Sequence, residues 1–239
     1  MERPAMNTPR IRFFLASALR LTVIALSLAA TGCATSGLGT LEGVIKDGHR
    51  ASRREAQLVR IERGGGTAKT KRGMTLMKAD RIVTPKDVSV VIKFAGGSKV
   101  LVEPESDLEI LNPTVFVRQG VVIILKLRKV REGLKAQTKY TLAAPEGTLF
   151  KVEVRGEKVT YKVVEGQLRV DSLQNAEPQV VFRAFEQGTV VGPELPGNVL
   201  PLDRSEAKKI RETLEAALKV LRVAAGLKVL WELLDIFQD

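Results

Sequence analysis

The sequence predicts a mainly β fold that is followed by one long α-helix. Short runs of Val, Ile and Leu recur through the middle of the chain and are separated by glycine-containing turns. This pattern is typical of a β-sandwich, a barrel or a coiled stack of strands. Aromatic residues make up only 5% of the chain, so we expect a core of branched aliphatic side chains, which favour strands.

The amino terminus has the features of an export signal. Arg3, Arg10 and Arg12 precede an apolar stretch whose uninterrupted core runs from Leu21 to Ala30. This core is shorter than the roughly 20 residues that a bilayer-spanning helix needs. A basic start, a short apolar core and small residues after it predict a signal peptide over residues 1–32.

The segment Leu28–Cys33 reads Leu-Ala-Ala-Thr-Gly-Cys and resembles the bacterial lipobox, although Ala30 stands where Leu is usual. The resemblance implies cleavage between Gly32 and Cys33 and palmitate-type acyl chains on Cys33, which would bind membrane lipid. The alternative is an ordinary secretory signal with a chance cysteine. Cys33 is the only cysteine, so no intramolecular disulfide can form.

Export sets the expected compartment and partners. Ala34 follows the cysteine, and a residue other than Asp there resembles lipoproteins sent to the outer membrane in some bacteria. We therefore expect a periplasmic protein that is anchored to the outer rather than the inner membrane. The formal net charge is +11 for the full chain and +8 without residues 1–32, which favours anionic lipids or cell-wall polymers. Nucleic acid is not expected, because the protein is exported.

Residues 33–56 are expected to form a lipidated, flexible and basic tether, since Ser, Thr and Gly are frequent directly after Cys33. His49, Arg50, Arg53 and Arg54 cluster within it. These residues form either a juxtamembrane patch on anionic headgroups or a solvated basic stretch.

A β-domain is expected over residues 57–202. Strand reversals are expected at 119–120, 145–147 and 165–166, where glycines interrupt the apolar runs. The triplet Gly64-Gly65-Gly66 is interpreted as a turn, because no Lys-Ser/Thr pair and no helix follow it.

Four elements occur in order along this region: an Asp followed by a Thr, a glycine-serine turn, a Gly-Thr-x-Phe-x-Val segment and a Glu-Gly pair. In this order they resemble the FecR family of periplasmic domains. The matching residues are Asp80, Thr84, Gly97, Ser98, Gly147, Thr148, Phe150, Val152, Glu165 and Gly166. The resemblance implies a strand-coiled, solenoid-like β-domain, whereas the periodicity alone fits a sandwich equally well.

The motif residues also have a structural interpretation. Gly147 suits a positive φ angle, and Phe150, Val152 and Val154 alternate so that they share one face of a strand. Gly166 suits a reversal between two valine-rich strands. We therefore interpret these residues as parts of the scaffold rather than as a binding site.

The last segment, residues 203–239, predicts an amphipathic helix over 204–237. Asp203 is the expected N-cap, with Glu206 completing a capping box. Ile210, Leu214, Ala217 and Leu221 form one apolar stripe, and a second stripe starts at Val220 and ends at Phe237. The helix is expected either to cover an open strand edge of the β-domain or to associate with a partner or a second copy.

Catalytic chemistry is not expected. His49 is the only histidine, which excludes a His-dependent triad or a His/Cys zinc site in the β-domain, and no cofactor is expected. Glu103, Glu105, Asp107 and Glu109 alternate and could bind a cation, or they could line a solvated strand. The densest basic run could contact an anionic partner through Lys126, Arg128, Lys129 and Arg131.

Together these features predict a non-enzymatic, membrane-anchored envelope lipoprotein. Its FecR-like domain would bind another envelope component, a protein or peptidoglycan, in a scaffolding or sensing role. The alternative is a FecR-type signal-transduction regulator that acts with a transmembrane partner. A hydrolase that uses the carboxylates at 103–109 is the third possibility.

Overall fold

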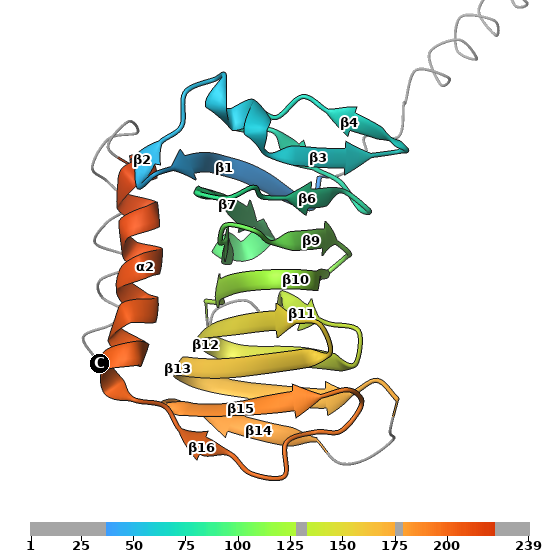
Figure 1. The fold of residues 1–239 in the computed structure, drawn as a ribbon, viewed down its shortest axis with the longest axis vertical. Coiled ribbons are helices and arrows are strands. Elements are labelled where there is room, and N and C mark those ends of the chain that lie inside the picture. The colour runs from blue at the N-terminus through green and yellow to red at the C-terminus, as the bar shows by residue number, and fades with distance from the viewer. Residues whose placement is uncertain (1–36, 128–132, 175–178, 223–239) are drawn as a thin grey trace, which may run out of the picture. The chain divides into compact units, whose positions relative to one another are not determined.

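The computed structural model describes residues 37–127, 133–174 and 179–222. Residues 37–239 form a compact unit that is separate from residues 1–36, and the description concerns this unit. Its strands stack one above another, and a single long helix runs alongside them (Figure 1). The mainly β fold with a C-terminal helix is therefore confirmed.

The strands belong to one 16-stranded sheet. They are β1 (Gly39–Lys46), β2 (His49–Arg50), β3 (Arg60–Arg63), β4 (Gly66–Ala68), β5 (Thr75–Leu76), β6 (Arg81–Val83), β7 (Val88–Phe94), β8 (Lys99–Val102), β9 (Asp107–Ile110), β10 (Thr114–Leu125), β11 (Lys135–Gln137), β12 (Thr141–Arg155), β13 (Lys158–Ser172), β14 (Val180–Arg183), β15 (Glu186–Val191) and β16 (Leu200–Pro201). Short 3-10 helices η1 (Glu55–Leu58) and η2 (Ala95–Gly97) and the α-helix α2 (Arg204–Arg222) complete the described elements.

Three long strands fold the sheet into two layers. The second half of β10 pairs with β8 and β12, whereas its first half pairs with β9 and β11. The two halves of β13 likewise pair with β15 and with β14. We call the layer of β1, β7, β8 and β15 the helix-side layer, and the layer of β3, β6, β9, β11 and β14 the open layer.

The glycines predicted to reverse the chain bend single strands instead. Gly120, Gly147 and Gly166 lie inside β10, β12 and β13 with φ angles of 92°, 58° and 74°. The pairing register shifts beside each of them. The predicted reversals at 119–120, 145–147 and 165–166 were therefore wrong, because a positive φ beside a bulge can bend a strand without ending it.

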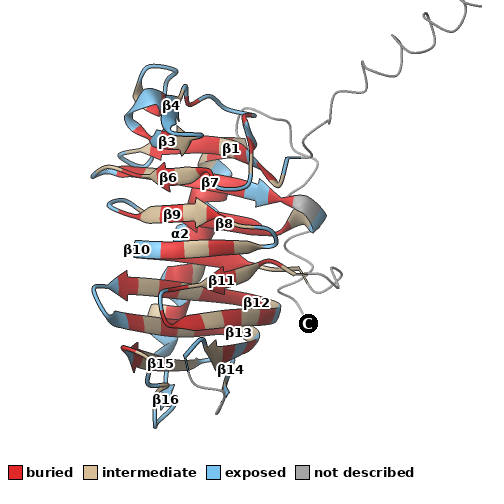
Figure 2. Cartoon of the chain, turned by 90° about the vertical axis from the view of Figure 1, so that its right-hand side faces the viewer, coloured by how far each residue is buried: buried red, intermediate tan, exposed pale blue. Residues whose placement is uncertain are grey.

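The main core lies between the two layers. Phe150, Val152 and Val154 point into it from β12, as their alternation predicted, and Tyr161 enters from β13. The core closes against η1 near β1, through Ala56. Burial in red follows alternate positions along the strands (Figure 2).

Helix α2 covers the outer face of the helix-side layer. Its buried stripe of Ile210, Leu214, Ala217 and Leu221 joins a second core with sheet residues such as Val91 and Ile123. The covering role is confirmed for the described part of the helix, although α2 covers a sheet face rather than a strand edge. No helix within the described ranges is long and apolar enough to cross a membrane.

The cap of α2 matches the prediction in part. Asp203 Oδ1 accepts hydrogen bonds from the backbone N–H groups of Ser205 at 2.8 Å and Glu206 at 3.4 Å. The Glu206 carboxylate pairs with Lys162 of β13, so its side chain serves the helix-sheet contact. Residues 223–237 of the predicted helix, with most of its second stripe, lie outside the described residues.

The flexible tether expected over residues 33–56 is wrong for most of its length. Residues 39–46 form β1, which pairs with β7 from end to end, and Leu41 and Val44 are buried. The β-rich unit therefore begins at Gly39 rather than at residue 57. A bulge between Leu41 and Gly43 breaks the alternation of apolar and polar residues. The sequence of β1 therefore lacks the period of two that predicts a strand.

Candidate functional site

The FecR-like motif residues Gly147, Thr148 and Gly166 lie on the line where the strands bend. Thr148 is fully buried, and its hydroxyl donates to the Gln167 carbonyl at 2.7 Å and accepts from the Glu146 N–H at 3.0 Å. These bonds join β12 to β13 at the step between the layers. Phe150 and Val152 continue from there into the core.

Asp80 and Thr84 fix loops of the open layer. The fully buried carboxylate of Asp80 accepts two hydrogen bonds from the Arg63 guanidinium, at 2.7 and 2.6 Å, and one from the Met77 N–H at 2.8 Å. The Thr84 hydroxyl donates to the Glu103 carbonyl at 2.7 Å. The polar groups of both side chains therefore have hydrogen-bond partners within the fold, and the charge of Asp80 is balanced by Arg63.

The remaining motif residues lie in a turn and at the contact with α2. Gly97 and Ser98 belong to the turn between β7 and β8, where Gly97 has a φ angle of 87° and the Ser98 side chain is buried. Glu165 pairs with Arg211 of α2, which fastens the helix to the sheet beside Gly166. The interpretation of these residues as parts of the scaffold stays a prediction.

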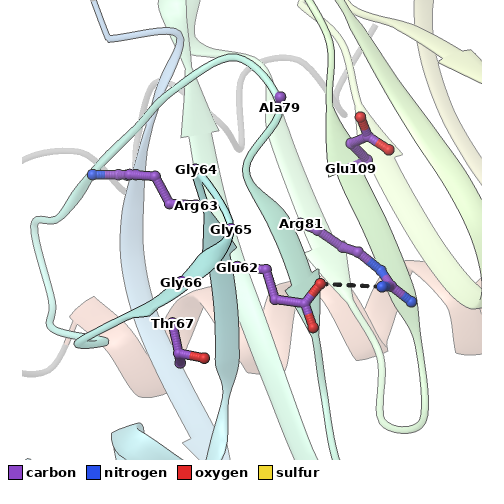
Figure 3. A pocket seen from close by; sticks show the side chains of 9 residues that line it. All are labelled: Glu62, Arg63, Gly64, Gly65, Gly66, Thr67, Ala79, Arg81 and Glu109. Atoms are coloured by element: carbon purple, nitrogen blue, oxygen red, sulfur yellow. Dashed lines mark hydrogen bonds and ion pairs between the residues drawn. The ribbon is translucent and has the colours of Figure 1, made fainter.

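A hollow of about 360 Å³ lies beside the β3–β4 hairpin (Figure 3). Its lining consists of Glu62, Arg63, Gly64, Gly65, Gly66, Thr67, Ala79, Arg81 and Glu109. Gly64 and Gly65 both have positive φ angles and form the tight turn that the sequence predicted.

The charges in this hollow have partners within the chain. Arg81 donates to both oxygens of Asp107, at 2.8 and 2.6 Å, and also to Glu62 at 3.1 Å. Glu109 pairs with Arg118. A ligand would have to compete with these ion pairs, so we do not assign a binding role to the hollow.

The acidic run is divided by the fold. Asp107 and Glu109 face outward on β9 within the ion pairs just described, whereas Glu103 lies beyond the end of β8 and Glu105 lies in a turn. Burial raises the pKa of Glu103, which Lys151 opposes. Within the described ranges no group of three or more His, Cys, Asp or Glu residues could hold a metal ion.

Two predicted sites lie wholly or partly outside the described residues. Gly32 and Cys33 are outside them, as are Arg128, Lys129 and Arg131. The remaining member of the basic run, Lys126, donates to the Pro145 carbonyl at 2.7 Å, and burial lowers the pKa of its ammonium group. Lys126 thus stabilises the start of the β12 bend, and the predicted anionic contact stays a prediction for the other three residues.

The structure adds a surface that sequence reasoning missed. Six of the seven exposed large hydrophobic residues of the described chain lie between residues 173 and 200, at the β14–β16 end of the stack. We call them the distal surface: Leu173, Val181, Phe185, Val191, Val199 and Leu200. Arg204, the first residue of α2, lies over the ring of Phe185, with its guanidinium carbon 5.9 Å from the ring centroid.

Strand edges are open at the same end. Among the described strands β14 pairs only with β13, and β16 covers only Glu186 and Gln187 of β15. Unpaired edges can accept an additional strand. Exposed positions gather around β14 and β16 (Figure 2), so apolar side chains and free backbone groups occur together there.

Comparisons with known proteins give the following matches. No protein-family model and no curated protein sequence matches the chain. Two crystal structures of a candidate anti-sigma factor from Parabacteroides distasonis are similar, each with a TM-score of 0.46 and 17% sequence identity over 56% of this chain. The similar region spans 64% and 63% of those chains, which is less than two thirds of their length.

Proposed function

We propose that the protein is a non-enzymatic lipoprotein of the cell envelope, anchored through Cys33, that binds a protein partner through its distal surface. The observation that carries this proposal is the segregation of exposed hydrophobic residues to the β14–β16 end. Large apolar patches on soluble domains mark interaction sites. The role is one of scaffolding or sensing at the membrane.

The apolar side chains of this end favour a protein over a cell-wall polymer. A partner segment with apolar side chains would cover the exposed hydrophobic residues. The open edges of β14 and β15 would supply backbone hydrogen bonds to an extended segment.

Site-specific photocrosslinking in cells tests this function. A photoreactive amino acid at Phe185 is expected to yield one discrete crosslinked species. The same probe at Thr67, which is exposed on β4 at the other end of the stack, is expected to yield none. Leu200→Asp should abolish the Phe185 crosslink, because it places a charge within the apolar surface.

Leu58→Asp is the matched control, because Leu58 is 50% exposed and Leu200 is 56% exposed, at opposite ends of the stack. The control should leave the Phe185 crosslink intact. Loss of the crosslink in both variants, or crosslinking at Thr67 alone, would contradict a partner at the distal surface.

The regulator remains the second candidate, supported by the ordered FecR-like motif residues from Asp80 to Gly166. A FecR-type regulator with a transmembrane partner requires no acylated cysteine. Mass spectrometry of the native amino terminus distinguishes the two. Acylated Cys33 at the terminus supports the lipoprotein, whereas an uncleaved chain supports the regulator.

A further inference from the structure

The end of the stack opposite the distal surface is built from η1 and the segment that follows β4. The Thr70 hydroxyl donates to the Val59 carbonyl at 2.8 Å, and the Gln57 side chain donates to the Thr70 carbonyl. These bonds hold residues 69–72 against η1. We call the exposed residues of this end the proximal surface: Arg50, Arg53, Arg54, Leu58, Lys69, Lys71 and Arg72.

The proximal surface is basic, and its charges are not neutralised within the fold. Nine basic and four acidic residues lie between residues 37 and 72. Arg63 and Arg81 of the neighbouring open layer form ion pairs with Asp80 and Asp107. By contrast, no residue of the proximal surface forms an ion pair with any residue in the described parts of the chain.

An exposed apolar side chain lies among these charges. Leu58 is the last residue of η1 and is 50% exposed, whereas the nearby Ala56 and Val59 are buried. Leu58 is the one exposed large hydrophobic residue of the described chain outside the distal surface. Basic residues around a protruding apolar side chain are typical of surfaces that contact lipid headgroups.

The described residues begin at the β1 end of the stack. Gly37 is the first of them, and the Leu38 N–H donates to the Leu76 carbonyl of β5 at 2.9 Å, beside β1. Cys33 precedes Gly37 by four positions in the sequence. Six strand spacings separate β1 from β15, so the distal surface lies about 29 Å from β1.

We infer that the proximal surface docks on anionic lipid headgroups, with Leu58 entering the headgroup layer. The basic side chains of the proximal surface are complementary to anionic headgroups. An acyl chain on Cys33 would keep this surface close to the bilayer, because only a short segment links Cys33 to Gly37. The inference rests on the proposed acyl anchor. Docking would hold the stack upright, with the distal surface facing away from the membrane.

Hydrogen-exchange mass spectrometry on the full chain tests this inference. The protein is purified from membranes and reconstituted into vesicles of phosphatidylcholine, or of an equal mixture of phosphatidylcholine and phosphatidylglycerol. Backbone amides of residues 49–58 and 69–73 should exchange several-fold more slowly on the anionic vesicles. High salt should remove this difference, because it screens exposed charges, while β14–β16 should exchange equally on both vesicles.

Charge reversal supplies the matched variants. Arg53→Glu with Arg54→Glu should abolish the slower amide exchange, or protection, that the anionic vesicles cause. Lys158→Glu with Lys208→Glu makes the same change of charge at exposed sites on β13 and in the first half of α2 and should preserve it. Leu58→Asn should reduce the protection, and its counterpart Leu200→Asn should not.

Equal exchange on the two vesicles would overturn the inference, as would equal effects of the two charge-reversal pairs. The proposed function is tested separately, by the mass of the Cys33 peptide and by the Phe185 crosslink. If Cys33 is acylated and Phe185 crosslinks, but exchange is no slower on the anionic vesicles, the docking inference is contradicted and the proposed function is not.

Discussion

A β-carbon at Gly166 would come within 2.2 Å of the carbonyl oxygen of Gly147. The two glycines lie on the neighbouring strands β13 and β12, at the line where the sheet passes from one layer to the other. Their close approach allows both strands to bend at the same level. The Glu-Gly and Gly-Thr pairs of the FecR-like pattern therefore serve one structural purpose.

Gly166→Ala is expected to destabilise the protein more than Gly156→Ala. Both residues have positive φ angles, 74° and 60°, but a β-carbon at Gly156 would meet no atom within 4 Å. The conformational cost of about 1–2 kcal/mol applies to both variants, and only Gly166→Ala adds a clash with backbone. Urea unfolding of both variants measures the difference, and equal losses would contradict the close approach.

Tyr161→Phe should lower the free energy of unfolding by about 1–3 kcal/mol, the cost of leaving a buried polar partner unsatisfied. The Tyr161 hydroxyl bonds the Thr141 hydroxyl, which bonds that of Thr138 at 2.6 Å, and all three side chains are fully buried. Burial raises the pKa of Tyr161 to about 12, so the phenol stays protonated at neutral pH. Chemical denaturation tests this prediction. The control is Thr67→Ala at an exposed position of β4, because the other tyrosine, Tyr140, is itself buried and bonded to Glu157.

Leu214→Ala should lower the free energy of unfolding by about 2–5 kcal/mol, as large-to-small changes in packed cores do. Leu214 is 3% exposed in the core between α2 and the helix-side layer. Glu215→Ala, at the next and exposed position, should change stability by less than about 0.5 kcal/mol. Similar small effects of both changes on the melting temperature would show that α2 does not cover the sheet in solution.

Glu103→Gln should stabilise the protein near neutral pH but not in acid. Burial raises the pKa of Glu103 above its ordinary value of 4.5, so the folded state binds the proton more tightly than the unfolded state. Stability is therefore lost as the pH rises from below 4.5 through the raised folded pKa. Gln keeps the shape without the charge.

Thermal unfolding of Glu103→Gln and the wild type across this pH range checks the prediction. The gain in melting temperature should grow as the pH rises, and exposed Glu105→Gln should show no such growth. A gain that is constant with pH would mean that ionisation of Glu103 does not oppose folding.

The sequence predicts those parts of the fold that depend on local pattern. The alternation of Phe150, Val152 and Val154 placed them on the core face, and Asp203 marked the start of α2 correctly. The strand β1 was missed because a bulge interrupts its alternation, and the glycine bends were taken for reversals. Whether a glycine bends or ends a strand depends on its partners across the sheet, which a single sequence does not contain.

The candidate surfaces were predictable to different degrees. The basic cluster of the proximal surface was visible around Arg53, but Lys69 and Lys71 join it only through the contact of their segment with η1. The distal surface was not predicted, since its residues come from strand ends and a proline-rich connector. An apolar residue in such a segment is usually buried, and only the fold reveals that Phe185 and Leu200 remain exposed.

The contact between Leu221 and Gly43 has a consequence for the order of folding. A β-carbon at Gly43 would lie 2.4 Å from the Leu221 side chain, so the last described turn of α2 packs directly on the first strand. A nascent chain that stops before Arg204 would leave the apolar residues Val91 and Ile123 uncovered. Such long-range closure slows folding, and a newly made chain would reach its native state only after α2 has been synthesised.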